Sequence, residues 1–271
     1  MSLRLLQTKG TIDLERFRIP FRVYGEGEDI VCINGAQQSM AMWFSFIKNF
    51  SGRYRITLFD FPYQGKAKIK NNSEPVSIEE EVYVLHSVIK RLNIKNATIT
   101  SASWGGVCAL LFAIRHPGFA RLLVLASIGI RPNKLMRDII LKGINMNNRD
   151  RKEIANVLIQ SFGHKLPDNV KAQVVNQFNS MSCERLKAFC DHGMRVLSHD
   201  SLDKVVPLSE VKVNTVILYG EKDTILDYQD VAELTERIPC CRIEAVPGVG
   251  HFLHLEDEYV FKVYEAILLE K

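Results

Sequence analysis

The 271-residue sequence lacks the features that several broad classes of protein require. Its longest apolar stretch, residues 122–130, is about half as long as a membrane-spanning helix needs to be. It has no internal repeat, no low-complexity tract and no run of five basic residues, so no nucleic-acid partner is expected. The first residues contain no apolar segment of signal-peptide length. We therefore expect a soluble, cytoplasmic protein with no transmembrane segment.

The placement of the cysteines argues against two further roles, a metal site and disulfides. The sequence has six cysteines, with no Cys-x-x-Cys or His-x-x-x-His cluster that would suggest a metal site. Cys32 and Cys108 lie inside apolar runs, and Cys240 and Cys241 are adjacent, which disfavours a disulfide between them. We expect free, mostly buried thiols, no metal and no cofactor.

Charge is close to balanced but unevenly distributed. The formal net charge is +4. Residues 131–209 hold 13 Lys and Arg against 8 Asp and Glu, whereas the remaining residues hold 22 against 23. This excess is typical of a solvated helical surface. The alternative is a docking face for an acidic partner.

What is present is an alternation of strand and helix patterns. The short apolar, β-branched runs are residues 29–33, 54–59, 96–100, 121–125, 213–218 and 241–246. Helical patterns between or after them are residues 77–92, opened by a Ser-Ile-Glu-Glu capping box, 104–116, 227–238 and 256–269. Residues 5–24 are more amphipathic and predict two antiparallel strands around Lys9-Gly10. The pattern predicts an α/β fold with a mostly parallel, doubly wound sheet.

Residues 131–209 interrupt this alternation. They contain no convincing strand and are rich in Met and Asn, with Gly163 and Pro167 as breaks. Such a stretch is too long for a structureless loop inside a compact domain. We predict a helical cap, or lid, at 131–209, inserted into a core made of residues 1–130 and 210–271.

One serine stands where a nucleophile would be expected. The strand at 96–100 runs directly into Ser101-Ala-Ser103-Trp-Gly105, which opens the next helix. A serine on such a sharp strand-to-helix turn projects its Oγ above the sheet, and small neighbours are required around it. The alternative role for Ser103 is that of an ordinary helix N-cap.

A serine of this kind needs a base, and the expected chain order is Ser, acid, His. Asp223 follows the strand at 213–218, and His251 follows the strand at 241–246. Both positions lie where ligand groups belong in an open α/β sheet. Glu221 and Asp227 compete with Asp223 for the role of the acid, and His251 could instead be a buried structural histidine.

The remaining site candidates surround this constellation. The loop Asn34-Gly35-Ala36-Gln37 follows the first parallel strand, so we assign the backbone N–H groups of Ala36 and Trp104 to an oxyanion hole. Gly35, Gln37 and Phe252 are candidates for substrate binding. Asp60 also ends a strand but precedes Ser103, so we interpret it as a loop-stabilising carboxylate. Cys108 is expected in the core, and His254 near the site or on the surface.

These residues carry a specific resemblance. The sequence resembles α/β-hydrolase-fold 3-(3-hydroxyalkanoyloxy)alkanoate synthases, the rhamnosyltransferase A-subunit family of rhamnolipid biosynthesis, and the related 3-hydroxyacyl-carrier-protein:CoA transacylases. The motifs that carry it are Ile33-Asn-Gly-Ala36, Leu58-Phe-Asp-Phe-Pro-Tyr-Gln-Gly65, Ser101-Ala-Ser-Trp-Gly-Gly106 and Gly250-His-Phe-Leu-His-Leu-Glu256. A fainter match is Phe162-Gly-His-Lys-Leu-Pro167. The sequence departs from the family after Asp223 and at residues 37–43, which are bulkier.

The resemblance implies an acyltransferase that joins two 3-hydroxyacyl groups, taken from acyl carrier protein or CoA thioesters, through an acyl-enzyme on Ser103. It also implies that the basic excess in 131–209 suits an acidic carrier protein. Two alternatives within the same chemistry are acyl transfer from carrier protein to CoA, and an esterase or thioesterase that admits water. A third is a non-catalytic receptor that binds an apolar ligand.

Overall fold

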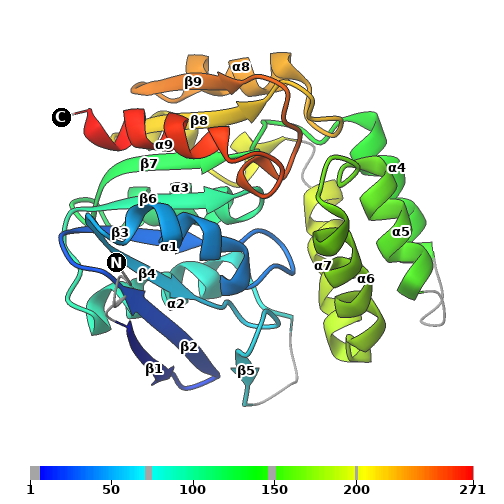
Figure 1. The fold of residues 1–271 in the computed structure, drawn as a ribbon, viewed down its shortest axis with the longest axis horizontal. Helices are drawn as coiled ribbons and strands as arrows, with labels where there is room; N and C mark the ends of the chain where they lie inside the picture. Colours follow the sequence, from blue (N-terminus) through cyan, green and yellow to red (C-terminus); the bar gives the residue numbers. More distant parts are fainter. Residues whose placement is uncertain (1–6, 71–74, 146–150, 199–200, 271) are drawn as a thin grey trace. The chain divides into compact units, whose positions relative to one another are not determined.

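A computed structural model describes residues 7–70, 75–145, 151–198 and 201–270. The strands are β1 (Gln7–Asp13), β2 (Phe17–Tyr24), β3 (Glu28–Ile33), β4 (Tyr54–Phe59), β5 (Lys68–Ile69), β6 (Ala97–Ala102), β7 (Ala120–Ala126), β8 (Asn214–Gly220) and β9 (Cys241–Val246). Within these residues they form a nine-stranded sheet in the order β1-β2-β4-β3-β6-β7-β8-β9, with β5 beside β2 (Figure 1).

The centre of the sheet is parallel and buried. β3 pairs in parallel with β4 and β6, and β6 pairs in parallel with β7, whereas β2 is antiparallel to β1, β4 and β5. All six residues of β6 are buried, as are the last four of β3 and β7. This confirms the predicted α/β fold with a mostly parallel sheet, because continuous apolar runs need helices on both faces.

The N-terminal strand pair is confirmed, but the prediction that it turns at Lys9-Gly10 is wrong. Gly10 lies within β1, opposite Phe21, and the backbone turns after Asp13, where the N–H of Leu14 donates to the C=O of Phe17 at 2.8 Å. A Cβ at residue 10 would lie 2.6 Å from the Phe21 ring. Residue 10 is therefore glycine because the Phe21 ring leaves no room for a side chain there, and not because the chain turns at this point.

The described α-helices are α1 (Phe44–Phe50), α2 (Ile78–Arg91), α3 (Gly105–Arg115), α4 (Lys134–Asn145), α5 (Arg151–Ser161), α6 (Asp168–Ser180), α7 (Cys183–Ser198), α8 (Tyr228–Arg237) and α9 (Tyr259–Leu269). The capping box is confirmed: Ser77 and Glu80 bond each other's backbone N–H at the start of α2. Helix α1 was not predicted. It buries Phe46, Ile47 and Phe50 at helical spacing.

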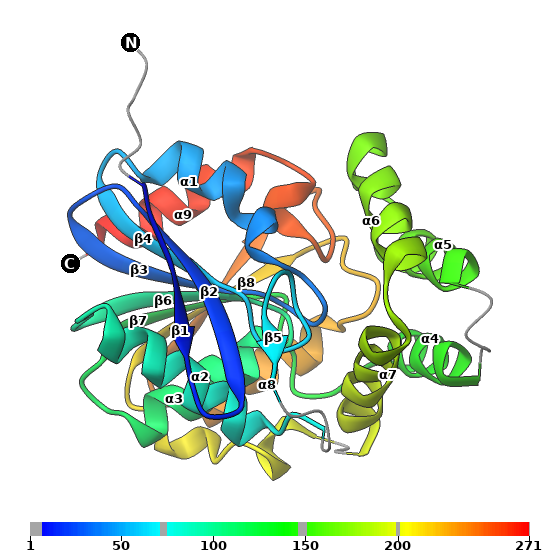
Figure 2. The same ribbon diagram turned by 90° about the horizontal axis from the view of Figure 1, so that it is seen from below.

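By their internal contacts the residues group into two compact units. The first unit comprises Met1–Ala126, Val206–Val216 and Arg237–Arg242, and the second comprises Ser127–Val205, Ile217–Glu236 and Ile243–Lys271. In the first unit, α1 covers one face of the parallel strands while α2 and α3 cover the other (Figures 1 and 2). The candidate site residues are divided between loops of the two units.

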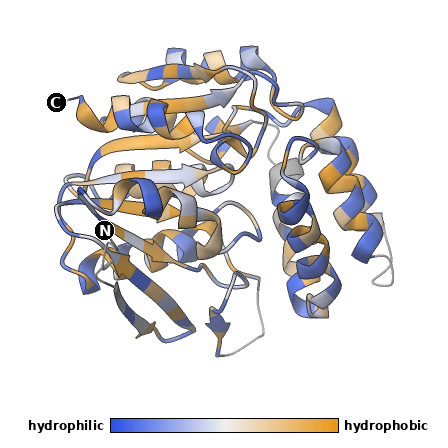
Figure 3. Cartoon of the chain, in the orientation of Figure 1, coloured by the Kyte–Doolittle hydropathy of each residue, from blue (hydrophilic) through white to orange (hydrophobic). Residues whose placement is uncertain are grey.

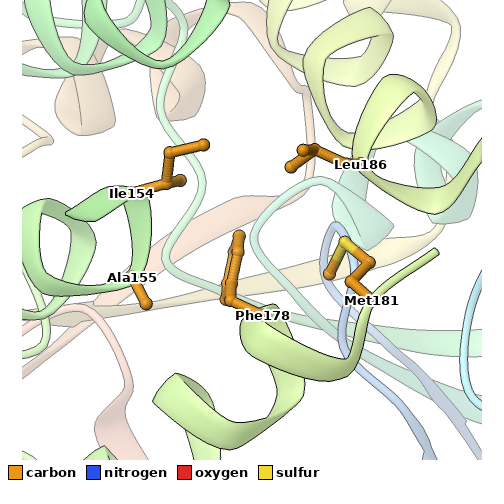
Figure 4. Close-up of a cluster of buried hydrophobic side chains, with 5 residues drawn as sticks. All are labelled: Ile154, Ala155, Phe178, Met181 and Leu186. Atoms are coloured by element: carbon orange, nitrogen blue, oxygen red, sulfur yellow. The ribbon is translucent and has the colours of Figure 1, made fainter. Parts of the chain in front are cut away.

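In the second unit, the predicted cap range 131–209 is helical where the structure describes it. It holds α4 to α7 and the short 3₁₀ turn Leu202–Lys204, and no strand among its described residues; the last residues of the range, from Val206 on, group with the first unit. Polar and apolar residues alternate along α6 and α7 (Figure 3). A small cluster of buried side chains joins α5, α6 and α7: Ile154, Ala155, Phe178, Met181 and Leu186 (Figure 4). The cap boundaries themselves stay a prediction.

The cysteines are all free, as expected, but the prediction that most are buried is wrong. Cys32 and Cys108 are fully buried, Cys190 and Cys241 are half-buried, and Cys183 and Cys240 are exposed. Burial raises the pKa of the Cys32 and Cys108 thiols well above the usual value. These two are core residues rather than nucleophiles.

Candidate active site

Ser103 lies on a strained turn between β6 and α3. Its φ of 46° is in the left-handed region, its N–H donates to the C=O of Ala126 at 2.7 Å, and its own C=O accepts from Gly106 at 2.9 Å. Positive φ at a non-glycine residue is costly and persists only where the surroundings enforce it. The indole N–H of the next residue, Trp104, donates to the buried Glu81 at 3.0 Å. The turn therefore holds Ser103 in one backbone conformation.

The loop after β3 lies directly against this turn. A Cβ at Gly105 would lie 2.6 Å from the backbone oxygen of Asn34, and one at Gly35 would lie 3.1 Å from that of Ala102. Only glycine allows the two backbones to approach this closely. The contact brings the segment that carries Ala36 to the segment that carries Trp104. Within the described part of the protein, no hydrogen bond occupies the Ala36 N–H.

A buried polar network supports the loop. Asp60 is 1% exposed; Oδ1 accepts from the N–H of Met40 at 2.8 Å and Oδ2 from that of Lys66 at 2.9 Å. These bonds tie the loop after β3 to the loop after β4, which is the loop-stabilising role expected for Asp60. Asn34 and Gln64 are each 1% exposed and bond each other beside it. Buried polar groups of this kind are stable only when they are hydrogen-bonded.

In the second unit, Asp223 and His251 form a close pair. His251 Nδ1 lies 2.8 Å from Asp223 Oδ2, and the two side chains are 6% and 0% exposed, respectively. The other carboxylate oxygen, Oδ1, accepts the N–H groups of Ile225 at 2.9 Å and Leu226 at 3.3 Å. Since Nδ1 donates its hydrogen to the carboxylate, Nε2 keeps the lone pair that a base needs.

Three further contacts hold the backbone around His251. The hydroxyl of Ser127 donates to the His251 C=O at 2.6 Å. The carboxylate of Glu256 accepts the backbone N–H groups of the two residues that flank His251: Gly250 at 2.5 Å and Phe252 at 3.0 Å. The imidazole is thus fixed through its side chain and through its main chain. His254 is buried, at 5% exposed, and contacts Phe261, so the surface alternative for it is wrong.

The helical segment contributes one aromatic residue to the surroundings of His251. The ring of Phe162 lies 5.6 Å from the imidazole at an interplanar angle of 73°, and 5.6 Å from the ring of Phe252. Phe252 itself packs edge-on against His251 at 5.7 Å. Two apolar rings therefore border the imidazole.

The residues next to Phe162 are anchored to both loops of the Asp–His pair. Thr224 donates its hydroxyl to the C=O of Ser161 at 2.7 Å, and Lys165 donates to the C=O of Gly248 at 2.6 Å. We call residues 161–165 the anchor segment. It connects the helices to the loop after Asp223 and to the loop before His251.

The predicted site residues divide between the two units. Gly35, Ala36, Gln37, Ser103 and Trp104 belong to the first unit, and Asp223, His251 and Phe252 to the second. Gln37 has a φ of 57° and is 6% exposed. In the second unit, Asp223 is the acid that contacts His251. The two competing acids, Glu221 and Asp227, are exposed, and the Asp227 carboxylate accepts a hydrogen bond from the Asn133 side chain.

Sequence reasoning missed several residues that support the site: Asn34, Gln64, Ser127, Phe162 and Glu256. Four of them stand in motifs that carried the family resemblance, yet the local pattern indicates nothing about their contacts. Among the described residues there is no group of three or more His, Cys, Asp or Glu side chains that could hold a metal. No described helix is long and apolar enough to cross a membrane.

Comparison with known proteins supplies the family. Residues 30–263 match the family model described as Alpha/beta hydrolase family. The chain belongs to the alpha/beta hydrolase family. A solved structure with the same fold is MGS-M2, an alpha/beta hydrolase from a Medee basin deep-sea metagenome library. It is 19% identical with a TM-score of 0.81, and the match covers 97% of this protein and 98% of that one.

Two curated relatives of this alpha/beta hydrolase differ in the activity that their names state. The (R)-3-hydroxydecanoyl-ACP:CoA transacylase of Pseudomonas putida is 25% identical over 247 residues, covering 88% of this protein and 83% of the relative. This confirms the resemblance inferred from the motifs. A 2-hydroxy-6-oxononadienedioate/2-hydroxy-6-oxononatrienedioate hydrolase of Comamonas testosteroni is 24% identical over 266 residues, covering 92% and 90%.

Proposed function

We propose that this protein is a serine acyltransferase that uses 3-hydroxyacyl thioesters of acyl carrier protein or CoA and joins two 3-hydroxyacyl groups into a 3-(3-hydroxyalkanoyloxy)alkanoate. The observation that carries the serine chemistry is the buried pair of Asp223 and His251, with Nδ1 and Oδ2 2.8 Å apart. The transacylase relative supports the class of substrate. The proposal places the reaction in the cytoplasm, where both thioesters are made.

In the first half-reaction, His251 Nε2 removes the proton of Ser103 as its Oγ attacks the thioester carbonyl. The negative charge on the tetrahedral oxygen is stabilised by the N–H groups of Ala36 and Trp104. The C–S bond then breaks, and the thiol leaves with the proton held by His251. The product is a 3-hydroxyacyl ester of Ser103. Asp223 keeps the imidazole in the reactive tautomer and stabilises its charged form.

In the second half-reaction, the 3-hydroxyl of a second 3-hydroxyacyl thioester attacks the ester on Ser103, which gives a dimeric acyl thioester. His251 accepts the hydroxyl proton and returns it to Oγ as the ester bond to the enzyme breaks. After the dimer is released from Ser103, water cleaves its remaining C–S bond, which yields the second thiol and the 3-(3-hydroxyalkanoyloxy)alkanoate. Transfer competes with hydrolysis only if water is kept from the base. The rings of Phe162 and Phe252 beside His251 support this requirement, since the imidazole is 6% exposed.

Product analysis tests the proposal. The protein and a Ser103→Ala variant would receive 3-hydroxyacyl thioesters of several chain lengths, on carrier protein and on CoA, with products identified by mass spectrometry. We expect dimeric 3-hydroxyacyl esters from the unmodified protein only, and a loss of about 10⁶-fold in turnover in the variant. Acyl-CoA formed from acyl carrier protein would favour the transacylase instead. Free 3-hydroxy acids alone would favour a hydrolase like the Comamonas testosteroni relative.

The second part of the proposal is that acyl carrier protein docks on the helical segment. Lys134 and Lys142 on α4 and Lys187 on α7 are exposed, and α4 packs against α7. Acidic partners are steered by such basic surfaces. Changing all three to Glu should raise KM for acyl carrier protein thioesters and leave KM for CoA thioesters unchanged. Equal KM values for carrier-protein substrates before and after the change would refute the docking.

A further inference from the structure

The peptide unit between Gly35 and Ala36 is held by its oxygen. The Gly35 C=O accepts from the side-chain Nε2 of Gln64 at 2.9 Å and from the backbone N–H of Gln38 at 3.2 Å. A trans peptide is planar, so its N–H points opposite to its C=O. The two bonds to the Gly35 oxygen therefore decide the direction of the Ala36 N–H, which is the donor assigned to the oxyanion.

The orientation of the Gln64 amide follows from its neighbours. The indole N–H of Trp43 can only donate, and it lies 3.0 Å from Asn34 Oδ1. Asn34 Nδ2 is then the donor and lies 3.2 Å from Gln64 Oε1. This leaves Gln64 Nε2 as the atom that faces the Gly35 C=O. A series of three hydrogen bonds thus runs from Trp43 to the peptide unit.

Gln64 is held in place by the turn that carries it. Its N–H donates to the C=O of Phe61 at 2.9 Å, and Gly65 follows at a φ of 44°. A Cβ at Gly65 would lie 2.0 Å from Asp60 Oδ2, so no other residue fits there. With Gln64 1% exposed, its amide exchanges no bonds with bulk water. The donor is fixed before any substrate arrives.

We propose that Gln64 is a positioning residue that locks the Gly35–Ala36 peptide with its N–H toward the developing oxyanion. If the peptide turned over, the Gly35 carbonyl would face the negative oxygen and repel it. The inference rests on the proposed function, because that function makes Ala36 a donor. Loss of one such donor typically lowers kcat by roughly 10² to 10³.

The test compares Gln64→Met with Gln38→Met. Methionine keeps the length of the side chain but cannot donate, and Asn34 Nδ2 retains the Phe59 C=O at 3.1 Å. Gln38→Met is the matched control, since the Gln38 side chain bonds the N–H of Gly35 at 2.7 Å and not its C=O. The substrate would be 3-hydroxydecanoyl-CoA. A trifluoromethyl ketone, which forms an anionic adduct with a serine, would report oxyanion binding.

For Gln64→Met we expect kcat to fall by roughly 10² to 10³, KM to change less than threefold, and the inhibition constant of the ketone to rise in parallel with the loss of kcat. Equal losses in Gln38→Met would mean that the loop has merely loosened, which would overturn the proposal. If Gln64→Met does not fold, Gln64→Glu keeps the acceptor for Asn34 and should show the same loss.

The two proposals fail separately. If Ser103→Ala keeps its turnover, the proposed function is wrong. If Ser103→Ala is inactive but Gln64→Met retains the kcat and ketone affinity of the unmodified protein, only the role of Gln64 is wrong.

Discussion

The two compact units hold their parts of the candidate site by different means. In the first unit, the group of interest is the backbone N–H of Ala36, and uncharged amides hold the peptide that carries it: Gln64 directly and Asn34 through Gln64, each 1% exposed. In the second unit, the group of interest is the imidazole of His251, and two carboxylates hold it: Asp223 through Nδ1, and Glu256 through the flanking backbone.

The difference follows from charge. An imidazole that accepts a proton becomes positive, so a buried carboxylate beside it stabilises the charged form. A backbone N–H must face a negative oxygen, and a carboxylate close to that oxygen would repel it. Amides fix a peptide plane without adding charge. In the first unit, the carboxylate of Asp60 accepts the backbone N–H groups of Met40 and Lys66, and it makes no hydrogen bond to the Gly35–Ala36 peptide itself.

The largest effect should come from removing the carboxylate charge in the second unit. Asp223→Asn would present an amide to His251 Nδ1 and favour the tautomer whose Nε2 carries hydrogen, so kcat should fall by about 10⁴. Steady-state kinetics would measure this. Asp227→Asn is the matched control on the same loop, because Asp227 is exposed and bonds Asn133 instead of His251. A large loss in the control and none in Asp223→Asn would transfer the role of the acid to Asp227.

Removing the second carboxylate, that of Glu256, should lower kcat by a smaller factor. Glu256→Gln replaces one acceptor oxygen by a donor, so either Gly250 or Phe252 loses the partner of its N–H. Displacement of a catalytic group by about 1 Å can cost roughly 10² in rate, and we expect kcat to fall by about 10- to 100-fold. Asp257→Asn, at an exposed carboxylate that accepts the N–H of Tyr259, should have little effect. If both variants retain full kcat, the main-chain contacts do not position His251.

The smallest effect concerns two imidazoles of the first unit that lie outside the candidate site. His86 and His116 stack at 3.8 Å and 14°. Burial lowers the pKa of both, with Lys90 adding to the effect on His86, and with His86, Arg115 and Lys90 adding to that on His116. Between the lowered folded pKa and the unfolded value of about 6.5, the unfolded protein binds more protons.

The stacked pair should therefore contribute stability above about pH 6.5, and this contribution should be lost as the pH falls through the lowered pKa values. The melting temperature measured between pH 7.5 and 5 should decline more steeply for the unmodified protein than for His86→Gln. Identical slopes would show that the pair does not titrate in this range. The test sharpens the contrast with His251, which lies against a buried carboxylate instead of a second imidazole.

Local patterns predicted the parts of the molecule that depend on local physics. Continuous apolar runs gave the strands, the capping box gave the start of α2, and small residues around Ser103 gave the strained turn, which has a φ of 46°. The order Ser, acid, His along the sequence predicts that Asp223 pairs with His251, and their side chains lie 2.8 Å apart.

Other features depend on contacts that no local pattern records. Gln64 meets Gly35 across 29 residues, and Ser127 meets His251 across 124. Phe46, Ile47 and Phe50 bury one face of α1, but so short an aromatic stretch does not separate a helix from a strand by its pattern. Gly10 suggested a turn, although it is required by a ring on the neighbouring strand. Tertiary contacts decided each of these cases.

The anchor segment also limits how this protein can be recombined. A chimera that took residues 131–209 from a relative would bring foreign residues against Thr224 and Gly248, whose bonds to Ser161 and Lys165 join the helices to the loops of Asp223 and His251. Exchange of the helices alone would therefore disturb the loops that carry Asp223 and His251. Retaining residues 161–165 of the host makes the crossover compatible with both loops.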